Sequence, residues 1–264
     1  MVEEVKHRVV VQGLLTRKIT DEVVKPFVES VKGTLHRDGP NFDTVNFSGD
    51  IACFGVLRGT SEVMAQASNF YYFDHAYMFG NRNLPSKIFK ERIYRLTKNY
   101  QHIREIDTLK AKDIKRIEKY QDHIKLKDWN YNGDYVLVCD ISEHAKKFYD
   151  KPNWLKDTLT ELKKHTKREI RVRSKDTKTS FKSDLKKAHA VVSFQSTVCI
   201  DAIVNGVPSF CDRVSMGIPV SLDDLSLIED PLYPGDRPFW INSLLANQFT
   251  MTEIKNGTAW EKVK

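Results

Sequence analysis

Residues 193–197 (SFQST) carry the side chains in this chain best suited to binding a phosphate. They follow an apolar, β-branched run that predicts a strand at 190–194, and helical spacing of apolar residues continues from 198 to 204. Hydroxyls at the carboxyl end of a parallel strand, beside the free N–H groups of a helix, can hold phosphate. An ordinary strand–turn–helix connection, with Ser196 as N-cap and Gly206 as helix stop, explains the same pattern without a ligand. The polar candidates are Ser193, Gln195, Ser196 and Thr197.

Basic side chains follow a second predicted strand, at 169–173. Arg171 and Arg173 alternate along it and therefore face the same side, and Lys175 comes just after its end. Arginine contacts phosphate oxygens in a bidentate manner, and Ser142 starts another helix after a strand. These groups predict a diphosphate site. The chain has no G-x-G-x-x-G motif and no P-loop lysine motif, which disfavours a dinucleotide redox enzyme or an ATPase.

The elements that must position these groups alternate between strand and helix, which predicts an α/β fold. A turn-rich segment at 128–134 (DWNYNGD) suggests a boundary between two Rossmann-like domains, residues 1–130 and 131–264, facing a cleft. The first domain is expected to have strands at 8–15, 44–47, 51–57 and 69–73, helices at 20–32 and 61–67, and helical periodicity over 103–124. The second is expected to have strands at 135–140, 169–173, 190–194 and 207–211, and helices at 142–148, 152–165, 198–204, 240–248 and 251–256. The last two helices can pack back across the first domain.

Composition predicts a globular protein without a membrane anchor. Hydrophobic residues make up 41% of the 264, yet no apolar run approaches the ~20 residues of a membrane span. Acidic residues precede the first strand-like run, so the start does not resemble a signal peptide. Four cysteines occur singly in apolar surroundings and are expected to be buried, reduced thiols, which points to the cytoplasm. They are Cys53, Cys139, Cys199 and Cys211.

The formal net charge of +7 is concentrated in two segments. Residues 87–127 hold 13 Lys and Arg against 6 Asp and Glu, and residues 146–187 hold 15 against 6. Such segments suggest a polyanionic partner, for example a nucleic acid. A solvated, lysine-rich surface accounts for the composition equally well.

Residues 190–210 (AVVSFQSTVCIDAIVNGVPSF) resemble the donor-binding half of two-domain glycosyltransferases of the GT-B fold. In those proteins a strand with small polar residues leads to Ser-Thr at a helix start, and a G-x-P turn leads to the next strand. Residues 70–80 (FYYFDHAYMFG) and 91–102 (ERIYRLTKNYQH) resemble segments of phage-type glycosyltransferases. The resemblance implies an acceptor-binding first domain and a donor-binding second domain. It implies transfer from a nucleotide-sugar, with UDP favoured, and 5-hydroxymethylpyrimidine in phage DNA as the favoured acceptor. A phage-encoded enzyme would act in the host cytoplasm.

Glycosyl transfer requires a base for the acceptor hydroxyl and stabilisation of the departing diphosphate. Asp74 is the predicted base, because it ends a strand after an apolar stretch expected to make its carboxylate more basic, and His75 lies beside it. Asp50 is the alternative base, and a plain turn-capping role explains Asp74 without catalysis. The predicted leaving-group contacts are Arg173, Ser196 and Thr197, with Gln195 and Lys175 behind them and Arg58 from the first domain.

A DNA acceptor would need basic and aromatic contacts in the first domain. The expected phosphate contacts are Arg82, Lys87, Lys90, Arg92, Arg95, Lys98 and Arg104, and the expected stacking residues are Tyr94 and Tyr100. The pair Asp223-Asp224 resembles a helix start more than a metal site, so no obligatory metal is predicted, although a divalent ion is possible. Two alternatives stay open: a polysaccharide or lipid-linked-sugar transferase, and a non-catalytic nucleic-acid-binding protein on the same fold. The donor sugar, the stereochemistry and the oligomeric state are not predicted.

Overall fold

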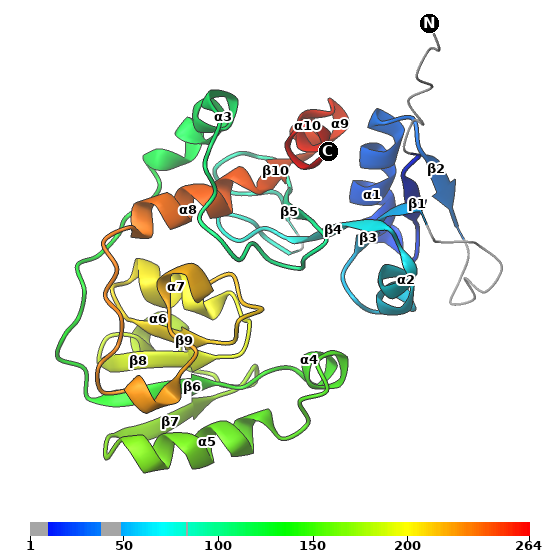
Figure 1. Ribbon diagram of the computed structural model, residues 1–264. Coiled ribbons are helices and arrows are strands. Elements are labelled where there is room, and N and C mark those ends of the chain that lie inside the picture. The colour runs from blue at the N-terminus through cyan, green and yellow to red at the C-terminus, as the bar shows by residue number, and fades with distance from the viewer. Residues whose placement is uncertain (1–9, 38–48, 83) are drawn as a thin grey trace, which may run out of the picture. The chain divides into compact units, whose positions relative to one another are not determined.

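The computed structural model describes residues 10–37, 49–82 and 84–264, which form two compact units (Figure 1). Unit 1 combines residues 1–101 with residues 247–264, and unit 2 consists of residues 102–246. Each unit has its own sheet covered by helices, so the α/β class predicted from the alternation of elements is observed.

Unit 1 is built on a six-stranded sheet with the order β10-β5-β4-β3-β1-β2. Strands β1 to β4 run parallel, whereas β5 is antiparallel to β4 and β10 is antiparallel to β5. The sheet is therefore mixed, whereas the alternation of strands and helices in the sequence predicts a parallel sheet. The described part of the connection between β4 and β5 contains no helix. For β5 to run parallel to β4, the chain would need a long crossover connection, usually a helix. The strands are β1 (Gln12–Leu14), β2 (Thr34–His36), β3 (Asp50–Phe54), β4 (Asn69–His75), β5 (Ile93–Lys98) and β10 (Gln248–Thr250).

Helices cover both faces of this sheet. One face packs against α1 (Lys18–Ser30), α9 (Met251–Lys255) and α10 (Thr258–Val263), and the other packs against α2 (Thr60–Gln66). Side chains alternate between the faces along each strand. Tyr71 and Phe73 of β4 therefore join the core under α1, where the rings of Phe27 and Phe73 are 5.0 Å apart, while Tyr72 points toward α2.

Unit 2 has a parallel sheet with the order β7-β6-β8-β9. Even-numbered core residues such as Val136 and Val138 pack under α5 and the 3-10 helix η2, whereas Leu137 and Cys139 pack under α6 and α7. Helix α3 lies against α8 in the same unit. The strands are β6 (Tyr135–Cys139), β7 (Glu169–Arg173), β8 (Ala188–Ser193) and β9 (Ser209–Cys211). The helices are α3 (Ala111–Gln121), α4 (Glu143–Phe148), α5 (Trp154–His165), α6 (Phe181–Asp184), α7 (Val198–Val204), η1 (Ile218–Val220), η2 (Leu225–Leu227) and α8 (Arg237–Ala246).

Gly206 ends α7 as the sequence predicted. Its φ is +79°, and the backbone N–H of Val207 donates to the carbonyl of Ala202 at 2.9 Å. A Cβ at Gly206 would lie 1.9 Å from the carbonyl oxygen of Asp128, so the turn also needs glycine for space. The other end of α7 differs by one residue, because its N-cap is Thr197 rather than Ser196.

The predicted domain boundary at residue 130 does not match the two units. Residues 102–130 belong to unit 2, where the Arg116 guanidinium donates to the carbonyl of Ala246. Residues 247–264 belong to unit 1, because β10 pairs with β5 and α9 packs on α1. Of the two terminal helices expected to pack on the first domain, the one at 251–256 (α9) does so, whereas the one at 240–248 (α8) belongs to unit 2. The helix expected at 240–248 is α8, which ends at Ala246 because the next residues enter β10.

The strand expected at 44–47 lies outside the described residues, as do residues 8–9 of the first expected strand. The four cysteines are free and buried, as expected. Among the described residues, no helix combines the length and the apolar character needed to cross a bilayer.

Candidate functional site

Hydroxyl groups gather at the carboxyl ends of the neighbouring strands β6 and β8 in unit 2. Ser193 ends β8 and is buried, and its hydroxyl makes no hydrogen bond within the described part of the chain. The Oγ of Ser196 accepts from the backbone N–H of Val198 at 3.4 Å, and Thr197 is exposed. Ser142 follows β6 and caps α4. The structure thus brings the predicted hydroxyls to one sheet edge, as parallel strands require.

Gln195 is held in place by two residues that the sequence reasoning did not single out. Its Oε1 lies 2.6 Å from Nε2 of His102 and 3.4 Å from the hydroxyl of Tyr149. The Tyr149 ring packs edge-on against Phe194 at 4.9 Å. With its oxygen engaged by these partners, Gln195 has its amide N–H groups to offer a ligand. His102 and Tyr149 were missed because their contact with Gln195 joins residues that are 93 and 46 positions away in sequence.

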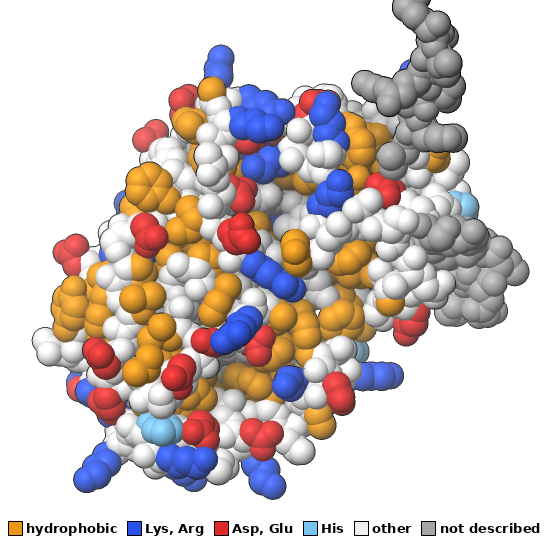
Figure 2. All heavy atoms as spheres, viewed as in Figure 1, with side chains coloured by type: hydrophobic (Ala, Val, Ile, Leu, Met, Phe, Trp, Pro, Cys, Tyr) orange, Lys and Arg blue, Asp and Glu red, His pale blue; other side chains and the backbone are white. Residues whose placement is uncertain are grey.

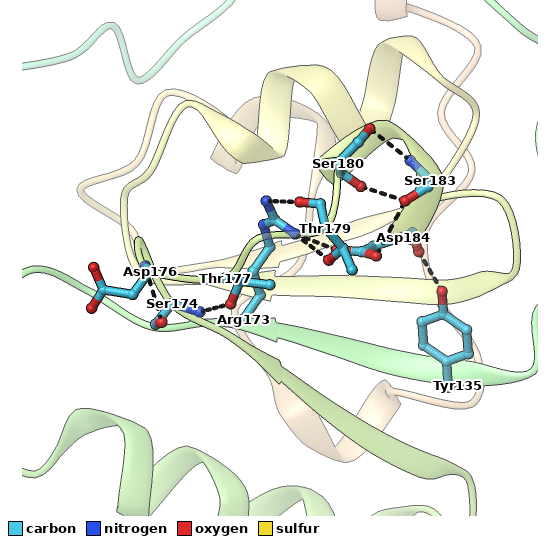
Figure 3. Close-up of polar contacts among 9 residues, drawn as sticks. All are labelled: Tyr135, Arg173, Ser174, Asp176, Thr177, Thr179, Ser180, Ser183 and Asp184. Atoms are coloured by element: carbon cyan, nitrogen blue, oxygen red, sulfur yellow. Dashed lines mark hydrogen bonds and ion pairs between the residues drawn. The ribbon is translucent and has the colours of Figure 1, made fainter.

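Arg173 is held by internal partners rather than left open for a diphosphate (Figure 3). It pairs with Asp184, and it donates to the Thr179 hydroxyl at 3.1 Å and to the Thr179 carbonyl at 2.7 Å. Asp184 is the last residue of α6, and the N-cap of this helix, Ser180, accepts a hydrogen bond from the backbone N–H of Ser183. Arg173 therefore ties the loop after β7 to α6, a structural role that the spacing of residues did not reveal.

The other predicted cations of this segment lie nearby on β7 and its loop. Arg171 pairs with Glu169 at 2.7 Å, and its guanidinium carbon lies 3.7 Å from the centre of the Tyr135 ring. Lys175 is exposed. Among the basic residues of β7 and the loop that follows it, Lys175 is therefore the predicted contact to the sugar donor that has the fewest partners within the chain.

In unit 1, Asp74 is the last residue but one of β4, and its carboxylate accepts hydrogen bonds from neighbouring described residues. Arg95, its cross-strand neighbour on β5, donates to Oδ2 at 2.8 Å, and the Tyr72 hydroxyl donates to the same oxygen at 3.1 Å. The backbone N–H of His75 donates to Oδ1 at 2.7 Å. These donors favour the ionised carboxylate. The apolar surroundings expected for Asp74 are therefore replaced by an ion pair whose cation, Arg95, is only 6% exposed.

His75 lies at the same strand end, with its ring between aromatic neighbours. The ring centroids of Phe54 and Tyr94 are 5.5 and 6.4 Å away. Burial lowers the pKa of His75, and the charges of Arg82, Arg95 and Arg17 lower it further against the opposing effect of Asp74. These effects favour the neutral imidazole in the folded chain.

Asp50, the alternative base, lies at the other edge of this sheet. It starts β3 and accepts from the Tyr71 hydroxyl at 3.0 Å and from the Asn69 amide at 2.9 Å. Arg58, by contrast, follows the carboxyl end of β3 and is exposed. The carboxyl edge of the unit 1 sheet therefore collects Asp74, His75 and Arg58, and excludes Asp50.

The predicted DNA contacts divide into buried and exposed groups. Arg95 and Tyr94 are buried and Arg92 pairs with Glu22, which does not fit contacts with DNA. Lys98 lies 5.6 Å from the Tyr71 ring centre. On the face in Figure 2, Lys and Arg are interspersed with Asp and Glu. The exposed candidates are Arg82, Lys87, Lys90, Arg104 and Tyr100.

The described residues contain no group of three or more His, Cys, Asp or Glu side chains arranged to hold a metal. Asp224 caps η2 by accepting from the backbone of Ser226, and Asp223 pairs with Arg213. Asp224 thus starts a helix, as predicted for this pair.

No known protein family matches the chain, and neither does any curated protein. Among solved structures, it is similar to Thermosulfurimonas dismutans KpsC, beta Kdo 2,7 transferase, with a TM-score of 0.54 and 11% identity over 96% of this chain and 99% of that chain. It also matches T. dismutans KpsC, beta Kdo 2,4 transferase, with a TM-score of 0.49 and 11% identity over 91% of this chain and 90% of that chain. At such identity the first likeness shows the fold alone: this chain has a Rossmann-like α/β fold similar to that of the 2,7 transferase.

Proposed function

We propose that this protein is a glycosyltransferase that moves a sugar from a nucleotide-sugar to a hydroxyl of a saccharide acceptor. The observation that carries this proposal is the set of polar residues 193–197 at the carboxyl end of β8, in a chain of which 96% is similar in fold to a Kdo transferase. In parallel sheets this edge is where nucleotide ligands bind. A saccharide acceptor is favoured over DNA for two reasons. The structural neighbour is a Kdo transferase. In addition, several side chains predicted to contact DNA, such as Arg92 and Arg95, are half-buried or buried and paired with carboxylates of this chain.

The proposed step has Asp74 as the base. The acceptor hydroxyl gives its proton to the Asp74 carboxylate while its oxygen attacks the anomeric carbon of the donor sugar. The bond from that carbon to the phosphate oxygen breaks, and the electron pair leaves with the nucleotide. In unit 2, Ser196, Thr197 and the Gln195 amide are the proposed hydrogen-bond donors to the phosphate of the nucleotide-sugar.

The test is an incubation of the purified protein with activated sugars and acceptors, followed by mass analysis of the products. Donors include an activated Kdo and a panel of UDP-sugars. Acceptors are Kdo-containing and neutral oligosaccharides, with 5-hydroxymethylpyrimidine DNA and unmodified DNA as the second acceptor class. A saccharide adduct supports the proposal, and an adduct on hydroxymethylated DNA alone replaces the acceptor with DNA. Absence of both transfer and donor hydrolysis, together with salt-sensitive DNA binding, would instead support a binding protein.

Asp74→Asn should lower kcat by about 10²–10⁴-fold, the usual contribution of a general base. Asp50→Asn is the matched control, because Asp50 also accepts from a tyrosine hydroxyl but lies at the other sheet edge. Donor binding by calorimetry and the melting temperature show whether Asp74→Asn is still folded. Turnover of folded Asp74→Asn at the wild-type rate would exclude Asp74 as the base.

A further inference from the structure

Two arginines meet at the carboxyl edge of the unit 1 sheet, from the loops that follow β1 and β3. The Nη1 of Arg58 lies 3.4 Å from the carbonyl oxygen of Thr16, the residue before Arg17. The Arg17 guanidinium carbon lies 5.2 Å from the centre of the Phe54 ring at the end of β3. A Cβ at Gly55 would be 3.4 Å from Nη2 of Arg17, so this guanidinium also rests against the β3–α2 loop.

The backbone holds both arginines at this edge. Thr20 Oγ1 accepts from the backbone N–H of Arg17 at 3.1 Å and donates to its carbonyl at 2.6 Å. Arg58 has a φ of +63°, a left-handed conformation that is rare outside glycine, between Gly55 at +67° and Gly59 at +77°. The Thr60 hydroxyl closes this loop by donating to the carbonyl of Leu57 at 2.7 Å.

Within the described residues, neither arginine forms an ion pair with a carboxylate. The carboxylate whose charge acts on Arg17 is that of Asp74, which is bonded to the buried Arg95. Burial and then the charge of Arg58 lower the pKa of Arg17, with Asp74 and Tyr72 opposing them. Two like charges held close together without a counter-charge are unfavourable until an anion binds between them.

We propose that Arg17 and Arg58 form an oxyanion-binding site that holds a phosphate or carboxylate of a substrate next to His75. The planar guanidinium groups suit the oxygens of either anion, and the N-terminus of the 13-residue helix α1 adds a favourable field. The His75 ring and the Arg17 guanidinium both lie against the Phe54 ring. The bound group would therefore lie beside His75 and the proposed base, Asp74. The identity of the ligand as a substrate group rests on the proposed function, but binding of a simple oxyanion does not.

The test is calorimetric titration of the full chain with inorganic phosphate and, separately, with glucuronate at low ionic strength. Wild type should bind at least one of them saturably. Arg17→Gln and Arg58→Gln should each weaken that binding at least about tenfold, the loss expected for one charged hydrogen bond. Lys18→Gln is the matched control, because it removes the same charge from the next residue, whose side chain is exposed. Its affinity should stay within about twofold of wild type.

A melting experiment separates ligand binding from a structural role. Without ligand, Arg58→Gln should melt no lower than wild type, because it relieves repulsion, while losing the rise in Tm that phosphate or glucuronate gives to wild type. The proposal is overturned if wild type binds neither anion, if both arginine variants bind normally, or if Lys18→Gln loses as much affinity.

Titration with UDP identifies which substrate carries the anion. If Arg58→Gln weakens UDP and phosphate binding equally, the site holds the phosphate of the donor. If UDP binding is unchanged while phosphate or glucuronate binding is lost, the site holds an acidic acceptor. Both results support an oxyanion site. The binding results can be interpreted even if no assay detects glycosyl transfer. The oxyanion site and the proposed glycosyltransferase activity can therefore be refuted independently.

Discussion

The most consequential pairing at the residue scale is Asp74 with Arg95. A carboxylate that already accepts from Arg95, Tyr72 and the backbone of His75 is held in one orientation. Such fixation suits a base that must meet a hydroxyl at a defined position. The Asp74→Ala substitution would leave the buried Arg95 guanidinium without its carboxylate partner. The isosteric Asp74→Asn is therefore the more informative substitution.

His75 should make the stability of the protein depend on pH. Its pKa is lowered in the folded state, chiefly by burial, so the folded chain resists protonation of this ring. The contribution of the neutral ring is fully present above the unfolded pKa of about 6.5 and is lost as pH falls through the lower folded value. The groups facing the ring are Asp74, Arg17, Arg82 and Arg95.

Chemical unfolding of wild type and His75→Gln at a series of pH values checks this expectation. Wild type should lose stability relative to the variant as pH falls from 7 to 5, because only wild type must protonate the buried ring. A stability difference that is constant across this range would show that the imidazole is solvated in the folded protein.

Candidate functional side chains could be predicted from the sequence only where the prediction depended on their local position along the chain. The positions of Asp74, His75 and residues 193–197 at strand ends could be predicted, because strand ends can be recognised from apolar runs. Their partners could not be found in this way, since Arg95 comes from an antiparallel strand and Arg173 is tied to Asp184 on α6. Arg17 lies in the loop after β1, and its position soon after an apolar strand was the available signal.

At the scale of elements, local patterns predicted most of unit 2 and less of unit 1. Parallel strands such as β6 and β8 are continuous apolar runs and were located from sequence. Strand β5 (IYRLTK) mixes buried and charged residues, and β10 has three residues, so neither pattern is typical of a strand. Their pairing is decided by contacts between distant segments.

Gly206 provides a test of the α7–β9 connection. Gly206→Ala should lower the free energy of unfolding through two effects: about 1–2 kcal/mol for a left-handed backbone and roughly 1–3 kcal/mol for the clash with Asp128. Gly257→Ala is the matched control, because its φ is +83° but a Cβ there meets nothing within 4 Å.

Chemical denaturation of the two glycine variants, followed in each unit by hydrogen exchange, measures both costs. Gly257→Ala should show the backbone cost alone, in unit 1, and Gly206→Ala should show the larger loss, in unit 2. Equal losses would mean that the carbonyl of Asp128 moves away freely.

At the scale of the whole molecule, unit 1 is assembled from two distant stretches of chain. Residues 247–264 contribute β10, which completes the sheet, and the helices that cover Tyr71 and Phe73. A chain stopped after Ala246 should therefore lose the cooperative folding of unit 1. Hydrogen exchange should show unprotected amides in β4 and β5, while β6 and β8 remain protected.

Residues 102–246 expressed alone are the control for this truncation, and they should fold with a single cooperative transition. Protected β4 and β5 amides in the truncated chain would show instead that β10 and the helices after it are dispensable for the unit 1 core.

The late arrival of β10 has a consequence for synthesis on the ribosome. Strand β5 ends at Lys98, but its outer neighbour begins only at Gln248. At bacterial to eukaryotic translation speeds, the free backbone edge of β5 is exposed for on the order of 10–30 s. During that interval the whole of unit 2 is synthesised, while the nascent sheet of unit 1 presents an open strand to other chains. Aggregation in cells should therefore respond to chaperones that shield nascent chains, and slower translation should increase it.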